Sequence, residues 1–204
     1  MITKQVVLDI MRYNILLACI LSLTIQHCFA QKKEEREYRI TKEELPKNAI
    51  SVLHDYLETA KRIRYYKEID GNKSSFEVKF KKNKIFYSIE FNEQGLLEDV
   101  EFIIDEKDIP LPTLKKVQNH LSQNFDKTRI KKIQRQYPNT ESSPKIVLNR
   151  AFENSMIPSI NYEIIIATRD KDGFHEYEVT YDSMGNHLLT RKSIVPKYDH
   201  VLFQ

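Results

Sequence analysis

Few residues of this 204-residue chain stand at spacings that could support chemistry. The histidines after residue 30 form neither the H-x-x-x-H nor the H-E-x-x-H pattern, which would place two imidazoles on one helix face for zinc. No G-x-S-x-G motif presents an activated serine, and no glycine-rich run could surround a phosphate group. We therefore expect a protein that is not an enzyme and that has no metal and no cofactor. The histidines in question are His54, His120, His175, His187 and His200.

Acidic residues occur at two places where they could act in pairs, Glu77 with Glu90 and Glu176 with Glu178. In both places they alternate with apolar or aromatic residues, which is typical of a strand with one buried and one solvent-exposed face. The segment 170–173 is similar to the start of a calcium-binding loop, but the later oxygen ligands and the glutamate at the twelfth position are missing. We interpret the pairs as the solvent-exposed face of a sheet and the segment as a hairpin turn.

Several aromatic residues fall out of phase with the expected core. If Tyr87 and its alternate neighbours point inward, Phe86 points to the opposite face, and the same reasoning applies to Tyr66 and Phe174. Exposed aromatic side chains often anchor protein–protein interfaces. The alternative is that a helix, a loop or the other half of the chain covers them. The candidate partner-binding residues are Tyr66, Phe86, Glu90, Phe174 and Glu176.

The first thirty residues have the features of a cleavable signal peptide. Arg12 precedes an uncharged apolar run, Ile15–Ile25, and small residues, Cys28 and Ala30, stand three and one positions before the expected cleavage site. The run is shorter than the roughly 20 apolar residues that span a bilayer. We expect cleavage after Ala30 and a mature chain that is periplasmic or secreted, without membrane insertion.

Removal of this segment changes the chemistry of the chain. Both cysteines, Cys19 and Cys28, lie within it, so the mature protein has no thiol for a disulfide, a nucleophile or a metal site. The formal charge of +3 falls to +2, because two basic residues and one acidic residue are lost. This balanced charge argues against nucleic acid and leaves an unknown periplasmic or extracellular protein as the expected partner. Translation from Met1 or from Met11 gives the same mature chain.

The remainder has the pattern of two tandem repeats, residues 41–104 and 105–195. Each begins with an apolar residue and a proline, Leu45-Pro46 and Ile109-Pro110, and we expect the proline in the first turn of a helix. Apolar residues at helical spacing follow, namely Ile50, Leu53 and Leu57 in the first repeat and Leu114, Val117 and Leu121 in the second. A strand and a hairpin are then expected at 62–69 and 76–91, and again at 129–136 and 162–181.

Both repeats close with the same kind of turn. Asn92 or Asp182 starts the turn by hydrogen bonding to the backbone, Gly95 or Gly185 takes a left-handed conformation, and a leucine pair begins the next strand. The repeats differ at residues 137–161, an insertion that we expect to be either a functional loop or disordered. A charged segment, residues 31–40, and a tail, residues 196–204, flank the repeats.

This order of elements resembles the PepSY-like family of exported bacterial proteins, which have the fold of the beta-lactamase inhibitor protein. The resemblance covers residues 41–193 and implies an α+β fold, in which each repeat packs an N-terminal helix on an antiparallel sheet whose other face is open. It implies no activity and no cofactor, and members are common in Bacteroidetes-like bacteria. The motifs that carry it are Leu45-Pro46, Phe76-Glu-Val and Phe91-Asn-Glu-Gln-Gly-Leu-Leu, with Ile109-Pro110, Tyr162-Glu-Ile and Tyr181-Asp-Ser-Met-Gly in the second repeat.

The sequence therefore favours an exported, non-enzymatic binding module that is protein-binding or inhibitory through the open sheet face. The alternative is a small-molecule carrier or sensor with a pocket between the helices and the sheet. A flat or concave exposed sheet would favour the first, and a deep apolar cavity would favour the second.

Overall fold

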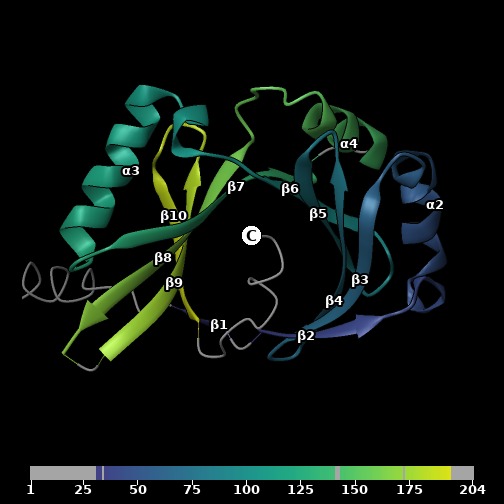
Figure 1. Ribbon diagram of the computed structural model, residues 1–204, viewed down its shortest axis with the longest axis horizontal. Coiled ribbons are helices and arrows are strands. Elements are labelled where there is room, and N and C mark those ends of the chain that lie inside the picture. The colour runs from purple at the N-terminus through teal and green to yellow at the C-terminus, as the bar shows by residue number, and fades with distance from the viewer. Residues whose placement is uncertain (1–30, 34, 141–142, 172, 194–204) are drawn as a thin grey trace, which may run out of the picture. The chain divides into compact units, whose positions relative to one another are not determined.

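The computed structural model describes residues 31–33, 35–140, 143–171 and 173–193, so the expected signal peptide and the tail lie outside the described residues. The described residues form an α+β structure on one ten-stranded sheet with the order β1-β10-β9-β8-β7-β6-β5-β4-β3-β2 (Figure 1). Neighbouring strands are antiparallel except β1 and β10. The strands are β1 (Gln31–Lys33), β2 (Glu35–Ile40), β3 (Lys61–Asp70), β4 (Lys73–Lys82), β5 (Ile85–Asn92), β6 (Leu97–Ile103), β7 (Arg129–Pro138), β8 (Asn161–Asp170), β9 (Gly173–Asp182) and β10 (His187–Ser193).

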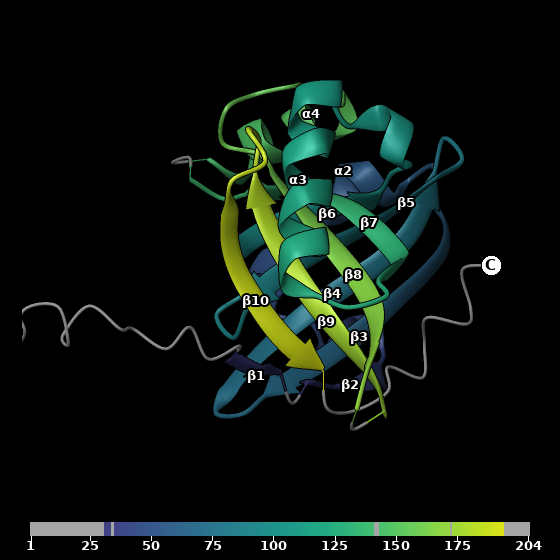
Figure 2. The same ribbon diagram turned by 90° about the vertical axis from the view of Figure 1, so that its left-hand side faces the viewer.

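Helices pack on one face of this sheet, which we call the outer face (Figures 1 and 2). The predicted helical stripes take part in the core, since Leu53, Val117 and Leu121 belong to one buried cluster with alternate strand residues such as Val78 and Val179. Among the described residues, no helix has the length and apolar character needed to cross a bilayer. The helices are α2 (Lys47–Leu57), α3 (Leu111–Asn124) and α4 (Pro144–Phe152), with short 3-10 helices η1 (Lys42–Glu44) and η2 (Glu106–Asp108).

A 3-10 helix with a capping box precedes both α2 and α3. In each, a carboxylate oxygen of the third residue, Glu44 or Asp108, accepts a hydrogen bond from the backbone N–H three residues earlier, at 2.7 and 2.9 Å. Pro46 and Pro110 stand at the N-cap of the following helix, one residue before the first turn in which we expect them. The acidic residues therefore cap a separate turn that directs the chain into each helix.

Residues 137–161 do not form the long loop that their prolines indicate, because the central part is α4. Pro144 lies in the first turn of this helix, where a missing N–H is tolerated, and Leu148 and Ala151 are fully buried. Phe152 packs among aromatic rings of α2, β4 and β5 at centroid distances of 4.8–6.3 Å. The insertion thus adds a third helix to the outer face.

The turns after β5 and β9 are built alike. Oδ1 of Asn92 and Oδ1 of Asp182 each accept hydrogen bonds from the backbone N–H groups two and four residues further on, at 2.8–3.0 Å. Gly95 and Gly185 have φ angles of +73° and +80°, which confirms the predicted left-handed conformation. After η1, and again after η2, the chain forms a helix and then four strands, with α4 as an addition to the second half.

The sheet curls until its two ends meet. β10 and β3 are second and ninth in the strand order, yet Nη1 of Arg191 on β10 lies 3.3 Å from Oδ2 of Asp70 on β3. The path of the chain requires the same curl, because β1 and β2 follow one another with one residue between them and pair with opposite ends of the sheet. We call the face turned away from the helices the inner face.

We expect Gly95→Ala and Gly185→Ala each to lower the free energy of unfolding by more than about 1 kcal/mol. An added Cβ would stand 2.6 Å from Cβ of Pro46 in the first case and 2.7 Å from the backbone oxygen of Thr113 in the second, besides requiring positive φ. Urea unfolding gives the measurement. Gly71→Ala is the matched control, because Gly71 has φ +60° but no atom within 4 Å of the added Cβ. Equal decreases in the free energy of unfolding at all three positions would mean that the close packing of the turns against the helices contributes nothing to stability.

Candidate functional site

The inner face carries polar residues that are largely shielded from solvent. Eight of them are only 2–8% exposed. The open sheet face that the resemblance implies is therefore not found in the described part of the chain, because the curl of the sheet encloses the centre of this face. Glu77 and Glu178, interpreted from the sequence as solvent-exposed, are among the enclosed residues. The eight are Glu68, Ser75, Glu77, Ser88, Glu101, Gln134, Glu163 and Glu178.

On β2, β3 and β4, one lysine lies among three carboxylates. Carboxylate oxygens of Glu37, Glu68 and Glu77 lie within 4.8 Å of one another, and Nζ of Lys79 lies 2.9 Å from Glu37 and 2.7 Å from Glu77. Burial alone would raise the pKa of Glu77, but the Lys79 ammonium and hydrogen bonds with Glu68, Lys79 and Ser88 lower it to about 2. We call these four residues the Lys79 cluster, in which the ammonium offsets part of the carboxylate charge.

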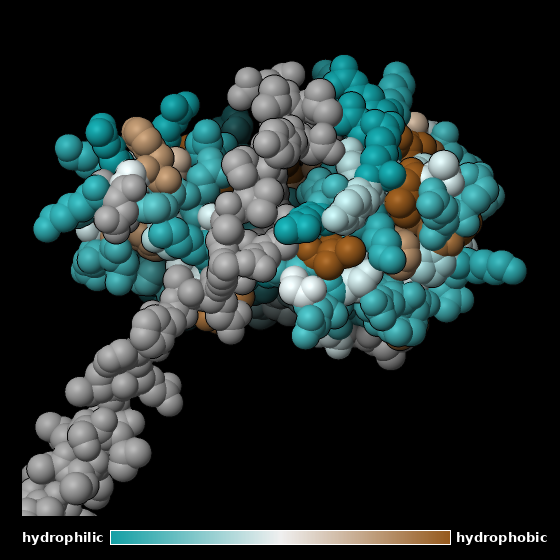
Figure 3. All heavy atoms as spheres, turned by 90° about the horizontal axis from the view of Figure 1, so that it is seen from below, coloured by the Kyte–Doolittle hydropathy of each residue, from teal (hydrophilic) through white to brown (hydrophobic). Residues whose placement is uncertain are grey.

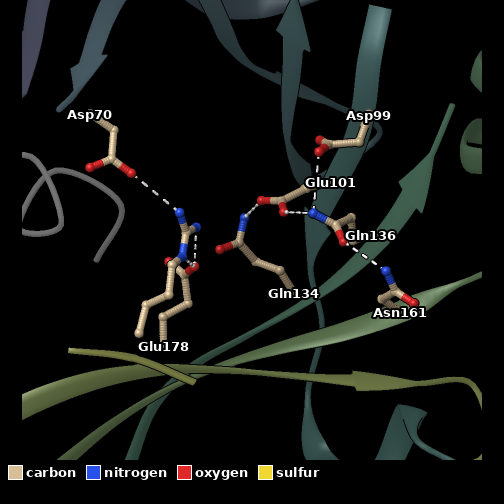
Figure 4. Close-up of polar contacts among 8 residues, drawn as sticks. Asp70, Asp99, Glu101, Gln134, Gln136, Asn161 and Glu178 are labelled. Carbon is tan, nitrogen blue, oxygen red and sulfur yellow. Dashed lines mark hydrogen bonds and ion pairs between the residues drawn. The ribbon is translucent and has the colours of Figure 1, made fainter. Parts of the chain in front are cut away.

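On β5 and β6, three further carboxylates meet, and we call Glu90, Asp99 and Glu101 the acidic centre. One oxygen from each lies within 4.8 Å of the others. Gln134 donates a hydrogen bond to Oε2 of Glu101, and Nε2 of Gln136 lies 3.0 Å from Oε1 of Glu101 and 3.2 Å from Oδ2 of Asp99 (Figure 4). Both donors are neutral amides on β7, so the hydrogen bonds orient the carboxylates without supplying positive charge.

The acidic centre is electrostatically unfavourable when all its groups are ionised. Burial is the largest cause that raises the pKa of Asp99 and Glu101 well above the usual range. Repulsion adds to it, from Glu90 and Glu101 on Asp99, and from Glu163 and Glu90 on Glu101. Lys132 lowers the pKa of Glu101, but by less than each of these two carboxylates raises it. Protons or another cation are therefore favoured at this point of the inner face.

Arg191 joins this region to the opposite end of the sheet. Its Nε donates to Oε1 of Glu178 on the neighbouring strand β9 at 2.9 Å, and its Nη1 donates to Oδ2 of Asp70 on β3 at 3.3 Å (Figure 4). Glu178 is only 2% exposed, so the guanidinium neutralises a carboxylate that has almost no contact with water. The contact with Asp70 lies where the two ends of the curled sheet meet.

All five residues selected from the sequence lie on the inner face, but with different exposure. Tyr66 is only 2% exposed, with Nζ of Lys79 4.8 Å from its ring centroid, so its expected role as an exposed anchor is wrong. Phe86 is half-buried, with Nζ of Lys81 4.6 Å from its ring centroid, and Glu90 belongs to the acidic centre. The alternation along each strand correctly predicts the face on which these residues lie. It does not predict their burial, because burial depends on the curl of the sheet.

Phe174 and Glu176 lie where the inner face reaches solvent, next to the β8–β9 turn. Phe174 is 76% exposed and has the guanidinium of Arg169, its partner across the hairpin, 5.1 Å from the ring centroid. Glu176 is paired with Lys131 at 3.8 Å. These two residues, unlike Tyr66, keep the accessibility that the sequence predicts.

The described residues offer a depression of about 450 Å³ between helix and sheet, at the C-terminal end of α3, but it is open to solvent. Its apolar lining comes from Leu121, Phe125 and Ile130, and the rest is polar. On the side of the molecule drawn in Figure 3, hydrophobic residues form small separate patches among hydrophilic ones. This depression is therefore not the deep apolar cavity that would favour the small-molecule alternative.

Sequence reasoning missed the residues at the middle of the inner face, above all Asp99, Glu101, Gln134 and Arg191. A signal was present, since Glu101 stands between the core residues Val100 and Phe102, as a strand with two different faces requires. What the pattern could not indicate is the pairing of β6 with β7, which brings the two glutamines to the carboxylates.

No family model matches the chain, and no curated protein matches its sequence. Among solved structures, it is similar to a DUF2874 family protein from Bacteroides ovatus, with 13% identity and a TM-score of 0.49 over 76% of this chain and 92% of that one. A Bacteroides eggerthii protein described as periplasmic has 10% identity and a TM-score of 0.49 over 77% and 94% of the two chains. A BLIP-like protein from Bacteroides fragilis has 12% identity and a TM-score of 0.45 over 72% and 86%. At these low identities we take neither function nor partner from these proteins.

We expect Glu101→Gln to stabilise the protein at pH 8, measured by urea unfolding with a chelator present. A carboxyl whose pKa is raised by folding contributes most to stability below the unfolded pKa of about 4.5, and this contribution is lost as the pH rises through the folded pKa. The gain from Glu101→Gln should therefore shrink as the pH falls toward 4.5. Rotation of the Gln134 amide lets its oxygen accept from the new amide, so the hydrogen bonds are kept.

The control for this measurement is Glu153→Gln, which removes the same charge from an exposed position at the end of α4. Its effect should be small and should not follow this pH dependence. A loss of stability in Glu101→Gln that is the same at pH 5 and pH 8 would contradict the electrostatic description of the acidic centre.

Proposed function

We propose that this protein is an exported, non-enzymatic binding module that binds another protein through the exposed end of its inner face. The observation that carries the proposal is Phe174, a large aromatic side chain that is 76% exposed beside Arg169. Aromatic residues and arginine are the types most enriched at the energetic centres of protein interfaces.

Charge around the hairpin is mixed. Exposed basic residues lie on β7, on β8 and in the β8–β9 turn, but Lys131 is paired with Glu176, and the sequence of the turn also contains Asp170 and Asp172. A partner with charged side chains of both signs around an apolar pocket would complement this surface. The basic residues are Arg129, Lys131, Arg169 and Lys171.

We propose further that the chain reaches its partner in the periplasm or outside the cell, after cleavage of residues 1–30. In our interpretation the two halves are tandem copies of one PepSY-like unit. Support comes from the matched turns at Gly95 and Gly185, which contact the first turns of α2 and α3 at corresponding positions. The capping boxes of η1 and η2 repeat in the same places. No described feature of either half requires catalysis.

Phe174→Ala should abolish capture of the partner while leaving the unfolding midpoint unchanged. Truncation of an aromatic anchor costs about 2 kcal/mol or more of binding, roughly a thirtyfold loss of affinity, whereas an exposed side chain contributes about 0.5 kcal/mol or less to folding. The measurement is a pull-down with residues 31–204 as bait from an envelope extract of the native organism, at low and at high salt. Capture by the unaltered protein should weaken at high salt.

Leu111→Ala is the matched control for the pull-down, because Leu111 is 63% exposed at the start of α3, away from the hairpin. It should retain the captured protein. Capture that survives Phe174→Ala, or that is lost equally in Leu111→Ala, would refute the assignment of the binding surface to the hairpin.

A further inference from the structure

We infer that the chain after Ser193 continues β10 and pairs with the open edge of β2, so that residues 194–200 complete the join between the two ends of the sheet. We call residues 194–200 the C-terminal segment, and they lie outside the described residues. Among the described strands, β2 is the last in the strand order and pairs with β3 alone. An open edge exposes backbone N–H and C=O groups that can pair with a further strand. This inference does not depend on the hairpin surface proposed above.

The pairing of β1 with β10 gives the register in which the C-terminal segment would follow β2. The two strands are parallel, and their last described pair is Lys33 opposite Ser193. After Lys33 the chain continues through one residue into β2. Continuation of the same register therefore places residues 195–200 opposite residues 35–40.

The end of β10 lies close to the start of β2, as this continuation requires. Nη1 of Arg191 is 3.3 Å from Oδ2 of Asp70, and Asp70 is the residue of β3 that lies opposite Glu35. On the other side of the expected path, β9 begins at Gly173, beyond the level of Ser193. A continued β10 would therefore have strands to pair with on both sides.

The C-terminal segment also has the length that the edge requires. β2 has six residues, and six residues of an extended strand span about 20 Å. Residues 195–200 match this length. Because the segment is joined to β10 beside the edge, its effective concentration there is far higher than that of a separate chain. Pro196 lacks one N–H donor, but the pairs that follow it are unaffected.

Charge favours this register over its neighbours. Glu37 and Arg39 alternate onto the inner face of β2, and the continued register places Lys197 opposite Glu37 and Asp199 opposite Arg39. A shift of two residues in either direction would place Lys197 opposite Arg39 or Asp199 opposite Glu37, which are pairs of like charge and destabilising. A shift of one residue would turn the side chains to the wrong face. Glu37 also belongs to the Lys79 cluster, where a second ammonium would complement the three carboxylates.

Tyr38 provides a further indication on the outer face. It is 48% exposed although it lies in the middle of a strand, and the continued register places Tyr198 directly opposite it. Neighbouring aromatic side chains on paired strands pack against each other and stabilise the pairing. The C-terminal segment would thus cover both the backbone edge of β2 and part of the Tyr38 ring.

The test is disulfide formation in residues 31–204 carrying Tyr38→Cys and Tyr198→Cys, because this part of the chain contains no other cysteine. Directly opposite residues of neighbouring strands are about 4.8 Å apart, which a disulfide can bridge. On mild oxidation we expect an intramolecular disulfide in the monomer, detected by intact mass after alkylation of free thiols. The matched control is Tyr38→Cys with Lys197→Cys, which should form the disulfide at least about tenfold more slowly because its thiols lie on opposite faces.

Urea unfolding of the reduced variants shows that both are folded before oxidation. Equal rates of disulfide formation in the two pairs, or no disulfide in the folded Tyr38→Cys, Tyr198→Cys variant, would overturn the inference. Disulfide-linked dimers through Tyr38→Cys in place of the intramolecular link would assign the edge to a second copy of this chain and would overturn it as well. Partner capture through Phe174 is measured separately, so either proposal can fail without the other.

Hydrogen exchange of peptides that cover β2 gives a second measurement. In Lys197→Pro combined with Tyr198→Pro, exchange in β2 should be at least about tenfold faster than in the unaltered protein, since two successive prolines remove the donor toward β2 in either phase of the ladder. Exchange in β5, which lies between β4 and β6, should stay the same. Unchanged exchange in β2 would contradict the inference.

Discussion

The approach of β10 to β3 is the constraint on which the rest of the structure depends. In a flat sheet, strands that are second and ninth in order would be separated by seven strand spacings, or about 34 Å. Arg191 and Asp70 instead lie 3.3 Å apart. In addition, β1 pairs with β10 at one end of the sheet and β2 pairs with β3 at the other, although only one residue separates β1 from β2 in the chain. Both observations require a curled sheet, and the helices on the outer face are compatible with it because they lie outside the curl.

Curling decides the chemistry of the inner face. Carboxylates from several strands are brought together and removed from water, and each must then find opposite charge, hydrogen-bond donors or a proton. Lys79 offsets part of the charge of the three carboxylates around it, Arg191 pairs with Glu178, and neutral amides donate to Asp99 and Glu101 in the acidic centre. Toward the β8–β9 turn the same face emerges into solvent, and Phe174 and Arg169 are exposed there. The inner face therefore has two parts. One is the enclosed middle, which carries the carboxylates, and the other is the exposed end near the β8–β9 turn.

The features predicted correctly from the sequence are those set by residues close to one another in the chain. The stripes of α2 and α3, and the turns that contain Gly95 and Gly185, follow from helical spacing and local hydrogen bonding. The face of the strand on which Tyr66 lies also follows from its near neighbours in the sequence. Its burial instead depends on the curl of the sheet, which brings together residues such as Arg191 and Asp70, 121 positions apart. The sequence did not predict α4, because Pro138, Pro144 and Pro158 around it are typical of a loop. Its nine residues also contain only one short buried stripe, Val147, Leu148 and Ala151. The acidic centre needed the register of three strands, which alternation alone does not give.

The curl of the sheet can be tested directly by cross-linking of residues 31–204, because this part of the chain contains no cysteine. Asp70→Cys combined with Arg191→Cys, treated with a short bismaleimide reagent, should give an intramolecular link in the folded protein, detected as a cross-linked peptide pair by mass spectrometry after proteolysis. The pair Asp70→Cys with Glu153→Cys, which places the second thiol at the end of α4 on the outer face, should not. Efficient linkage of the first pair alone, lost in urea, is the result that a closed sheet predicts. No linkage of Asp70→Cys with Arg191→Cys in a protein that is otherwise folded would contradict it.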